Sequence, residues 1–166
     1  MQRGASSVSF LLIVVLAAAF VWFTSRSLPN LVASHFGAHG IPNGFMRRDP
    51  YVIVIICLCI ALPLLVTVPL NFALRNPDMM INVPHREYWL APQRRADTVD
   101  FVRRQMTRFG LALLAFICYV HWLVVKANEQ IPPRLSSVAF VSALVMFAGF
   151  VTVWMAIFFN RFRNPP

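Results

Sequence analysis

The sequence predicts an all-α membrane protein with four transmembrane helices, and three observations support this fold class. Of the 166 residues, 58% are apolar and 13% are charged, whereas soluble domains average roughly 45–50% and about 25%. Four segments lack Asp, Glu, Lys and Arg and are long enough to cross a bilayer as helices. They are continuously apolar rather than alternating, which argues against membrane β-strands. We therefore expect a single four-helix membrane domain over residues 1–166.

The positions of the charged residues define the predicted spans. Crossing roughly 30 Å of hydrocarbon takes about 20 helical residues, and each uncharged segment approaches or exceeds this length. The predicted spans cover residues 4–25, 51–74, 109–125 and 135–160. Pro63 and Pro69 lie inside the second span. Because proline lacks a backbone N–H, we expect this helix to kink or to end early.

The basic residues predict the sidedness of the chain. There are 15 Lys and Arg against 6 Asp and Glu, which gives a formal net charge of +9. If the N-terminus is inside the cell, most of these basic residues are cytoplasmic. They are Arg3, those of the connection after the second span and those of the C-terminal tail. Because Lys and Arg concentrate in cytoplasmic loops, we expect both termini to be cytoplasmic.

The outer connection, residues 26–50, is predicted to be an ordered cap on the helix ends. It is rich in turn-forming residues, but it also keeps apolar residues such as Leu31 and Phe36, which a purely solvated loop does not need. Asn43 and Gly44 both tolerate positive φ, so this pair predicts a tight turn.

The inner connection, residues 75–108, is predicted to contain an amphipathic helix. Pro92 suits a first helical turn, and apolar residues follow it at helical spacing: Val99, Val102, Met106 and Phe109. We expect this basic helix to lie at the cytoplasmic interface, where its arginines meet anionic lipid headgroups, and to run into the third span. Tyr88, Trp89 and Leu90 are expected to anchor it among the headgroups.

Both connections contain stretches that resemble a bacterial membrane family related to the SdpI immunity proteins. In that family a Leu-Pro pair precedes His-Phe or His-Trp, then a Gly, then typically Asp-Gly-Trp. The matching outer residues are Leu28, Pro29, His35, Phe36, Gly40, Asn43, Gly44 and Phe45. A second family segment, Asn-x-Pro followed by Tyr-Trp-Leu-x-Pro, resembles an inner stretch with Asn82, Pro84, Tyr88, Trp89, Leu90, Pro92, Arg94 and Arg95.

The resemblance implies a protein of the bacterial cytoplasmic membrane. In the best-known members it implies protection against a secreted antimicrobial peptide and retention of a repressor at the membrane. Asn43 and Phe45 replace the commoner Asp and Trp of the family, so any role of that carboxylate is lost. We expect a non-enzymatic recognition, immunity or signalling component that has a peptide or membrane-protein partner and no cofactor.

Three histidines suggest an alternative function from a different class. His35 and His39 are four residues apart, and His121 lies near the outer end of the third span. Three histidine ligands around zinc would leave an open position for hydrolysis. The simpler interpretation assigns His35 a structural hydrogen bond that fixes the loop. It gives His121 a hydrogen bond at the interface beside Trp122.

A third possibility is a structural subunit of a larger membrane complex. Ala139 and Ala143 form a small-xxx-small pair in the fourth span, which suits helix association. The spans contain no acid, lysine or arginine, which argues against ion-coupled transport. No nucleic-acid-binding module accompanies the arginines, so no nucleic-acid partner is expected. The cysteines are expected to act as small hydrophobic residues: Cys57, Cys59 and Cys118.

Overall fold

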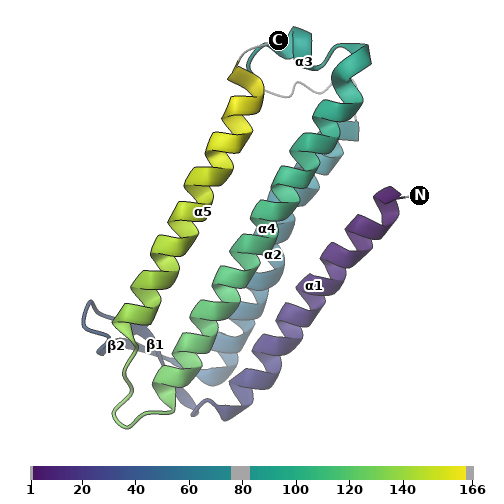
Figure 1. Cartoon of the computed structure of the whole chain (residues 1–166). Coiled ribbons are helices and arrows are strands. Elements are labelled where there is room, and N and C mark those ends of the chain that lie inside the picture. The colour runs from purple at the N-terminus through teal and green to yellow at the C-terminus, as the bar shows by residue number, and fades with distance from the viewer. Residues whose placement is uncertain (1, 76–82, 164–166) are drawn as a thin grey trace.

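The computed structural model describes residues 2–75 and 83–163, which form four long helices with a small sheet at one end (Figure 1). All four long helices are long and apolar enough to cross a membrane, which confirms the predicted all-α membrane fold. The long helices are α1 (Gln2–Thr24), α2 (Arg48–Arg75), α4 (Pro92–Asn128) and α5 (Ser137–Arg163). The short elements are the 3-10 helix η1 (Ser25–Ser27), the strands β1 (Leu31–Phe36) and β2 (Pro42–Arg47), and α3 (Arg86–Trp89).

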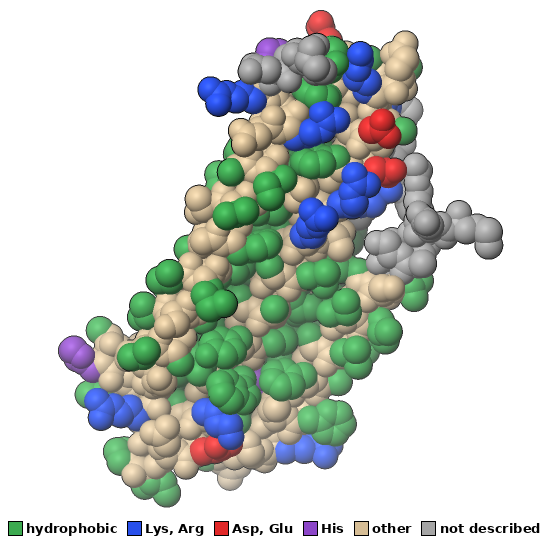
Figure 2. All heavy atoms as spheres, viewed as in Figure 1, with side chains coloured by type: hydrophobic (Ala, Val, Ile, Leu, Met, Phe, Trp, Pro, Cys, Tyr) green, Lys and Arg blue, Asp and Glu red, His purple; other side chains and the backbone are tan. Residues whose placement is uncertain are grey.

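Helices α1, α2 and α4 pack together, and α5 packs against α4 on the side away from α1 (Figure 1). The core between the first three helices contains Val14 and Val21 of α1, Cys59 of α2 and Leu114 of α4. The opposite face of α1 exposes large apolar side chains such as Leu12. Apolar side chains that face outward all along a helix are typical of contact with lipid. Figure 2 shows basic side chains toward the two ends of the molecule and hydrophobic ones between them.

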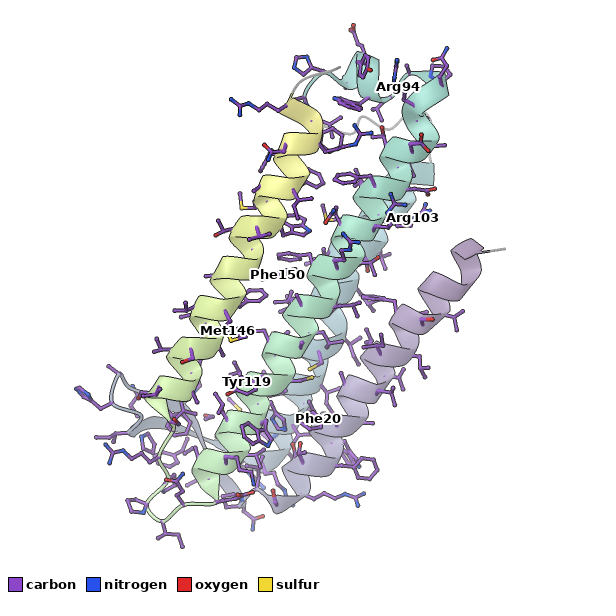
Figure 3. All side chains as sticks on the ribbon, in the orientation of Figure 1. Phe20, Arg94, Arg103, Tyr119, Met146 and Phe150 are labelled. Atoms are coloured by element: carbon purple, nitrogen blue, oxygen red, sulfur yellow. The ribbon has the colours of Figure 1, made fainter. Side chains whose placement is uncertain are left out.

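Aromatic side chains fill the space between α5 and α4, and Phe150 is among them (Figure 3). Phe147 of α5 stacks on Phe116 of α4 with 4.7 Å between ring centroids. Further along, the indole N–H of Trp154 donates a hydrogen bond to the backbone carbonyl of Gln105 over 2.9 Å. The outer faces of α5 remain exposed, so this helix is held mainly by one stripe against α4.

Helix α2 continues through both of its prolines, so of the two expected outcomes, a kink or an early end, the early end is wrong. It runs from Arg48 to Arg75, past Pro63 and Pro69. Pro63 is fully buried, and the Thr67 hydroxyl donates to the Pro63 carbonyl over 2.9 Å. A Thr side chain and neighbouring helices can satisfy the backbone around a proline in a spanning helix.

The hairpin of β1 and β2 turns at a different place from the one that the sequence predicts. Asn43 and Gly44 lie inside β2, whereas the turn is closed by the Gly37 N–H donating to the Ile41 carbonyl over 2.9 Å. Gly40 supplies the positive φ, 72°, that this turn requires. Gly44 instead faces His35 across the hairpin, where an added Cβ would lie 3.0 Å from the His35 Cβ.

Helix α4 joins the inner connection to the third span without a break. Its 37 residues correspond to about 55 Å at 1.5 Å per residue. The predicted amphipathic helix, residues 92–108, forms its first turns, and the helix continues past the predicted span to Asn128. We call the end of the bundle with η1, β1 and β2 the hairpin end. The opposite end, where α3 meets the start of α4 and the end of α5, is the Trp89 end.

Candidate functional site

The hairpin is held on the bundle by the side chain of Asn128, the last residue of α4. Its Oδ1 accepts a hydrogen bond from the Ala33 N–H over 2.9 Å, and its Nδ2 donates to the Ala33 carbonyl over 3.0 Å. The same Nδ2 donates to the Val124 carbonyl over 2.9 Å. The amide thus occupies the place that a neighbouring strand would take beside β1. Asn128 is absent from the residues that the sequence predicts, because an asparagine at a helix end is common.

The outer edge of β2 has backbone groups that point away from β1. In an antiparallel pair, the backbone N–H and C=O groups of successive residues point alternately toward the partner strand and away from it. Ala33 pairs with Phe45, and Ala33 bonds on its other side to Asn128. Arg48 donates its N–H inward to Asn30 over 3.0 Å. Both backbone groups of Phe45 and the N–H of Arg47 therefore point outward, and in the part of the chain that the structure describes no backbone group outside the hairpin bonds to them. The Arg47 carbonyl instead begins the hydrogen-bond ladder of α2.

The side chains of β2 alternate between the two faces of the hairpin, and every second one is exposed. Asn43, Phe45 and Arg47 are exposed, and the side chain of Phe45 is 56% exposed despite its size. On β1, Val32 is fully buried with Leu28, Tyr51, Val52 and Val124 in a cluster below the hairpin. The apolar residues of this connection therefore have two roles, because some fix the hairpin on the bundle and Phe45 is presented to the surroundings.

Gly40 holds the tip of the hairpin against the connection between α4 and α5. Its carbonyl accepts a hydrogen bond from the Leu135 N–H over 2.9 Å, and the Ser137 hydroxyl donates to the Ala38 carbonyl over 3.2 Å. A Cβ at Gly40 would overlap the Leu135 carbonyl oxygen. Only glycine permits this backbone approach, which gives a structural reason for this glycine of the outer stretch.

His121 connects the first three long helices, and its position corrects the sequence-based expectation. It is buried, with 1% of its surface exposed, rather than placed at the interface beside Trp122. Its Nε2 lies 2.8 Å from the Thr24 Oγ1, and its Nδ1 lies 3.0 Å from the Tyr51 hydroxyl. Phe20, labelled in Figure 3, meets its ring edge-on at 6.1 Å. The sequence could not reveal this because Thr24, Tyr51 and His121 lie on three separate helices.

The three histidines do not come together. His35 and His39 are exposed on the hairpin, and the Nδ1 of His35 lies 3.0 Å from the hydroxyl of the adjacent Ser34. That contact joins adjacent residues of β1, and the role of His35 in fixing the loop stays a prediction. Both ring nitrogens of His121 already have protein partners. Within residues 2–75 and 83–163, no three His, Cys, Asp or Glu side chains are grouped to hold a metal ion.

At the Trp89 end, Trp89 is a buried packing residue. It is 3% exposed and meets the ring of Phe162 edge-on at 5.8 Å. The Arg161 guanidinium carbon lies 4.1 Å from the centroid of the Trp89 ring, and the Thr98 hydroxyl donates to the Trp89 carbonyl over 2.8 Å. The expectation that Trp89 anchors among lipid headgroups is therefore wrong, because α4 and α5 cover it.

The other inner residues of the resemblance that the structure describes have different environments, and Tyr88 and Leu90 pack in the same cluster as Trp89. The Arg94 guanidinium carbon lies 3.9 Å from the ring centroid of Tyr88, and Figure 3 labels Arg94 near the start of α4. Arg95 and Leu90 are half-buried, Pro84 is exposed, and Pro92 begins α4. Asn82 lies outside the described residues.

The α1–hairpin–α2 unit has a counterpart among known protein families. Residues 11–65 match DUF1648, a membrane-associated domain of unknown function. The match begins in α1, includes the whole hairpin and ends within α2, so it contains the outer stretch and none of the inner one. No curated protein and no solved structure matches the chain.

Proposed function

We propose that this chain is a non-enzymatic recognition component of the bacterial cytoplasmic membrane, comparable in role to the SdpI immunity proteins, with the hairpin end outside the cell. The open edge of β2 carries the proposal. An exposed strand edge binds an extended peptide as an additional strand, with main-chain hydrogen bonds giving affinity. Phe45 supplies an N–H and a carbonyl, Arg47 supplies an N–H, and their side chains select the sequence of the peptide.

Charge at the hairpin end favours an acidic peptide. The basic residues at this end outnumber the acidic ones: Arg26, Arg47, Arg48, Lys126 and Arg134 against Asp49 and Glu129. Lys126 and Glu129 form a salt bridge of 2.8 Å, and Asp49 lies 3.8 Å from Arg48, which still leaves an excess of arginines. Complementary charge accelerates encounter and suppresses wrong partners.

The distribution of basic residues supports the proposed sidedness. Most arginines lie toward the Trp89 end, and exposed ones such as Arg94 and Arg104 suit anionic lipid headgroups. The more basic side of a membrane protein stays in the cytoplasm. Both chain termini then lie in the cytoplasm.

Helix α4 provides a physical connection between the two ends. Its last residue, Asn128, holds β1, and its early residues Val99 and Val102 pack with Trp89. A displacement of the hairpin on peptide binding therefore acts on the same rigid helix that packs at the Trp89 end. In this proposal, the Trp89 end signals to, or retains, a cytoplasmic partner protein.

The proposal is tested by placing the photo-crosslinking residue benzoylphenylalanine at Phe45 in intact cells exposed to secreted antimicrobial peptides. The matched control carries it at Phe159, which is similarly exposed, at 54%, on α5. We expect a peptide adduct at position 45 and none at position 159. When the adducted peptide is added to the protein in nanodiscs, it should slow amide exchange at Phe45 and Arg47. Exchange at Val32, already within the ladder, should stay unchanged.

A separate experiment measures on which side of the membrane the hairpin end lies. Peptide recognition and sidedness can therefore fail independently. The Asn43→Cys variant should react with a membrane-impermeant maleimide in intact cells. Labelling only after lysis refutes the outside location. Labelling without a peptide adduct at position 45, together with unchanged peptide tolerance after deletion of the gene, refutes recognition of a peptide.

A further inference from the structure

A cavity of about 560 Å³ lies at the hairpin end where α1 ends and α2 begins. Its lining combines polar residues with apolar ones: Ser25, Arg26, Arg48 and Asp49 with Trp22 and Ile53. This volume lies within the range of about 300–1,000 Å³ that is typical of small-molecule sites. None of these residues belongs to the β2 edge.

The polar half of the cavity is suited to an anion. Arg26 belongs to η1 and Arg48 is the first residue of α2, so two separate elements place arginines in the lining. The Arg26 guanidinium carbon lies 5.0 Å from the ring centroid of Phe23. The N-terminus of the 28-residue helix α2 adds its positive dipole end. Asp49 is the acidic residue of the lining; its Oδ1 lies 3.8 Å from the Arg48 Nε and its side chain is 80% exposed. The balance of charge at the cavity is positive.

Ser25 provides an independent observation at the same place. It is 3% exposed, and within the described residues its buried Oγ has no hydrogen-bond partner. The neighbouring hydroxyls differ, since Thr24 bonds to the Phe20 carbonyl over 2.7 Å and Ser27 to the Thr24 carbonyl over 2.9 Å. Buried polar atoms are nearly always paired, and an exception needs an explanation. A change of the Ser25 rotamer toward the cavity would let a ligand oxygen supply the missing partner.

The apolar half of the cavity indicates what accompanies the anion. Trp22 is 54% exposed and Ile53 is 62% exposed, on the membrane-spanning parts of α1 and α2. The polar half lies at the ends of these spans, the level at which lipid headgroups meet the hydrocarbon. An occupant with an anionic head and an apolar tail therefore matches both halves.

We propose that this cavity binds the phosphodiester of an anionic membrane phospholipid, with its acyl chains lying along α1 and α2 beside Trp22 and Ile53. Arg26 and Arg48 contact the phosphate, and the Ser25 hydroxyl donates to a glycerol or phosphate oxygen. Arg26 and Arg48 also contribute to the positive charge of the hairpin end, but the cavity shares no residue with the β2 edge, so either proposal can fail while the other holds.

The test measures binding of dioctanoyl phosphatidylglycerol to the purified full-length protein in detergent by native mass spectrometry. Arg26→Gln and Arg48→Gln should each weaken binding about tenfold, because each removes a charge-assisted hydrogen bond. The matched control is Arg134→Gln, an exposed arginine at the same end, which should leave binding unchanged. An equal loss in the control would show nonspecific charge attraction and overturn the site.

Two further arms separate the alternatives. Glycerol 3-phosphate in large excess should fail to displace the lipid, whereas displacement at comparable concentration would identify a free phosphate site and overturn the lipid proposal. Ser25→Ala removes a hydroxyl that has no protein partner, so the unliganded protein should keep its melting temperature while lipid binding falls about threefold. Unchanged binding in this variant overturns the role of Ser25 and, with unaffected arginine variants, the whole site.

Discussion

The two ends of the bundle combine hydrogen bonds and packing in different proportions. At the hairpin end, Asn128 and His121 make directed hydrogen bonds to residues of other elements. At the Trp89 end, one hydrogen bond from the Thr98 hydroxyl to the Trp89 carbonyl accompanies the aromatic and cation–π contacts of Trp89 with Phe162 and Arg161. Hydrogen bonds depend steeply on distance and angle, so they fix the register of a strand. Aromatic and cation–π contacts are favourable over a wider range of separations, about 4.5–7 Å between ring centroids and within about 6 Å for a cation.

This difference has a consequence for function. The hydrogen bonds of Asn128 fix β1 and thereby decide which backbone groups of β2 point outward. A binding edge needs such precision. The Trp89 end requires only that α3 and the ends of α4 and α5 remain together, and α5 has α4 as its main helical neighbour. Variants at the two ends should therefore differ in how much unfolding free energy they lose and in which elements exchange their amide hydrogens faster.

The largest effect is expected from Trp89→Ala. Removal of a buried tryptophan costs about 3–5 kcal/mol of unfolding free energy, because packing is lost and a cavity remains. The loss should appear in hydrogen–deuterium exchange as faster exchange in the last turns of α5, near Phe162, with the hairpin unaffected. Trp122→Ala is the control, since Trp122 is 38% exposed and should cost far less. Equal losses in both variants would contradict the assigned packing role.

The sequence predicted the helices far better than it predicted the environment of Trp89. Long uncharged runs identify spans because burying a charge in hydrocarbon is costly, and this rule needs only local information. A tryptophan between two spans fits a headgroup anchor equally well from sequence alone. Its burial depends on Phe162 and Arg161 in the last helix. The hairpin turn was misplaced for a similar reason, because contact with Leu135 fixes the position of Gly40.

An intermediate effect is expected from Asn128→Asp. The carboxylate can still accept from the Ala33 N–H, but it cannot donate to the carbonyls of Ala33 and Val124. Leaving such groups without donors costs about 1–3 kcal/mol. Amide exchange should accelerate throughout β1 and β2 and stay unchanged in α5. The control is Asn160→Asp, an exposed site on α5. Unaltered exchange in the hairpin would show that Asn128 does not fix its register.

The candidate site at the hairpin end was partly predictable. Leu28, Gly40 and Phe45 came from the resemblance, and the structure gives each of them a distinct place: buried cluster, backbone contact and exposed edge. The sequence could not predict the roles of Asn128, Thr24 and Tyr51. Their hydrogen bonds join separate helices and a strand, which only the fold brings together. A polar residue at the end of an apolar span is the available signal, and many such residues merely face water.

The smallest effect is expected from Arg161→Gln, which tests the cation–π part of the Trp89 end. An arginine over an aromatic face contributes about 0.5–1 kcal/mol at exposed sites and about 2 kcal/mol when desolvated. Arg161 is half-buried, so a loss of about 1 kcal/mol in unfolding free energy is expected, measured by thermal unfolding in detergent. Arg163→Gln, at an exposed position in the same helix, should cost nearly nothing. A loss for Arg161→Gln that exceeds the loss for Asn128→Asp would mean that directed polar contacts dominate at both ends, and the contrast between them would no longer hold.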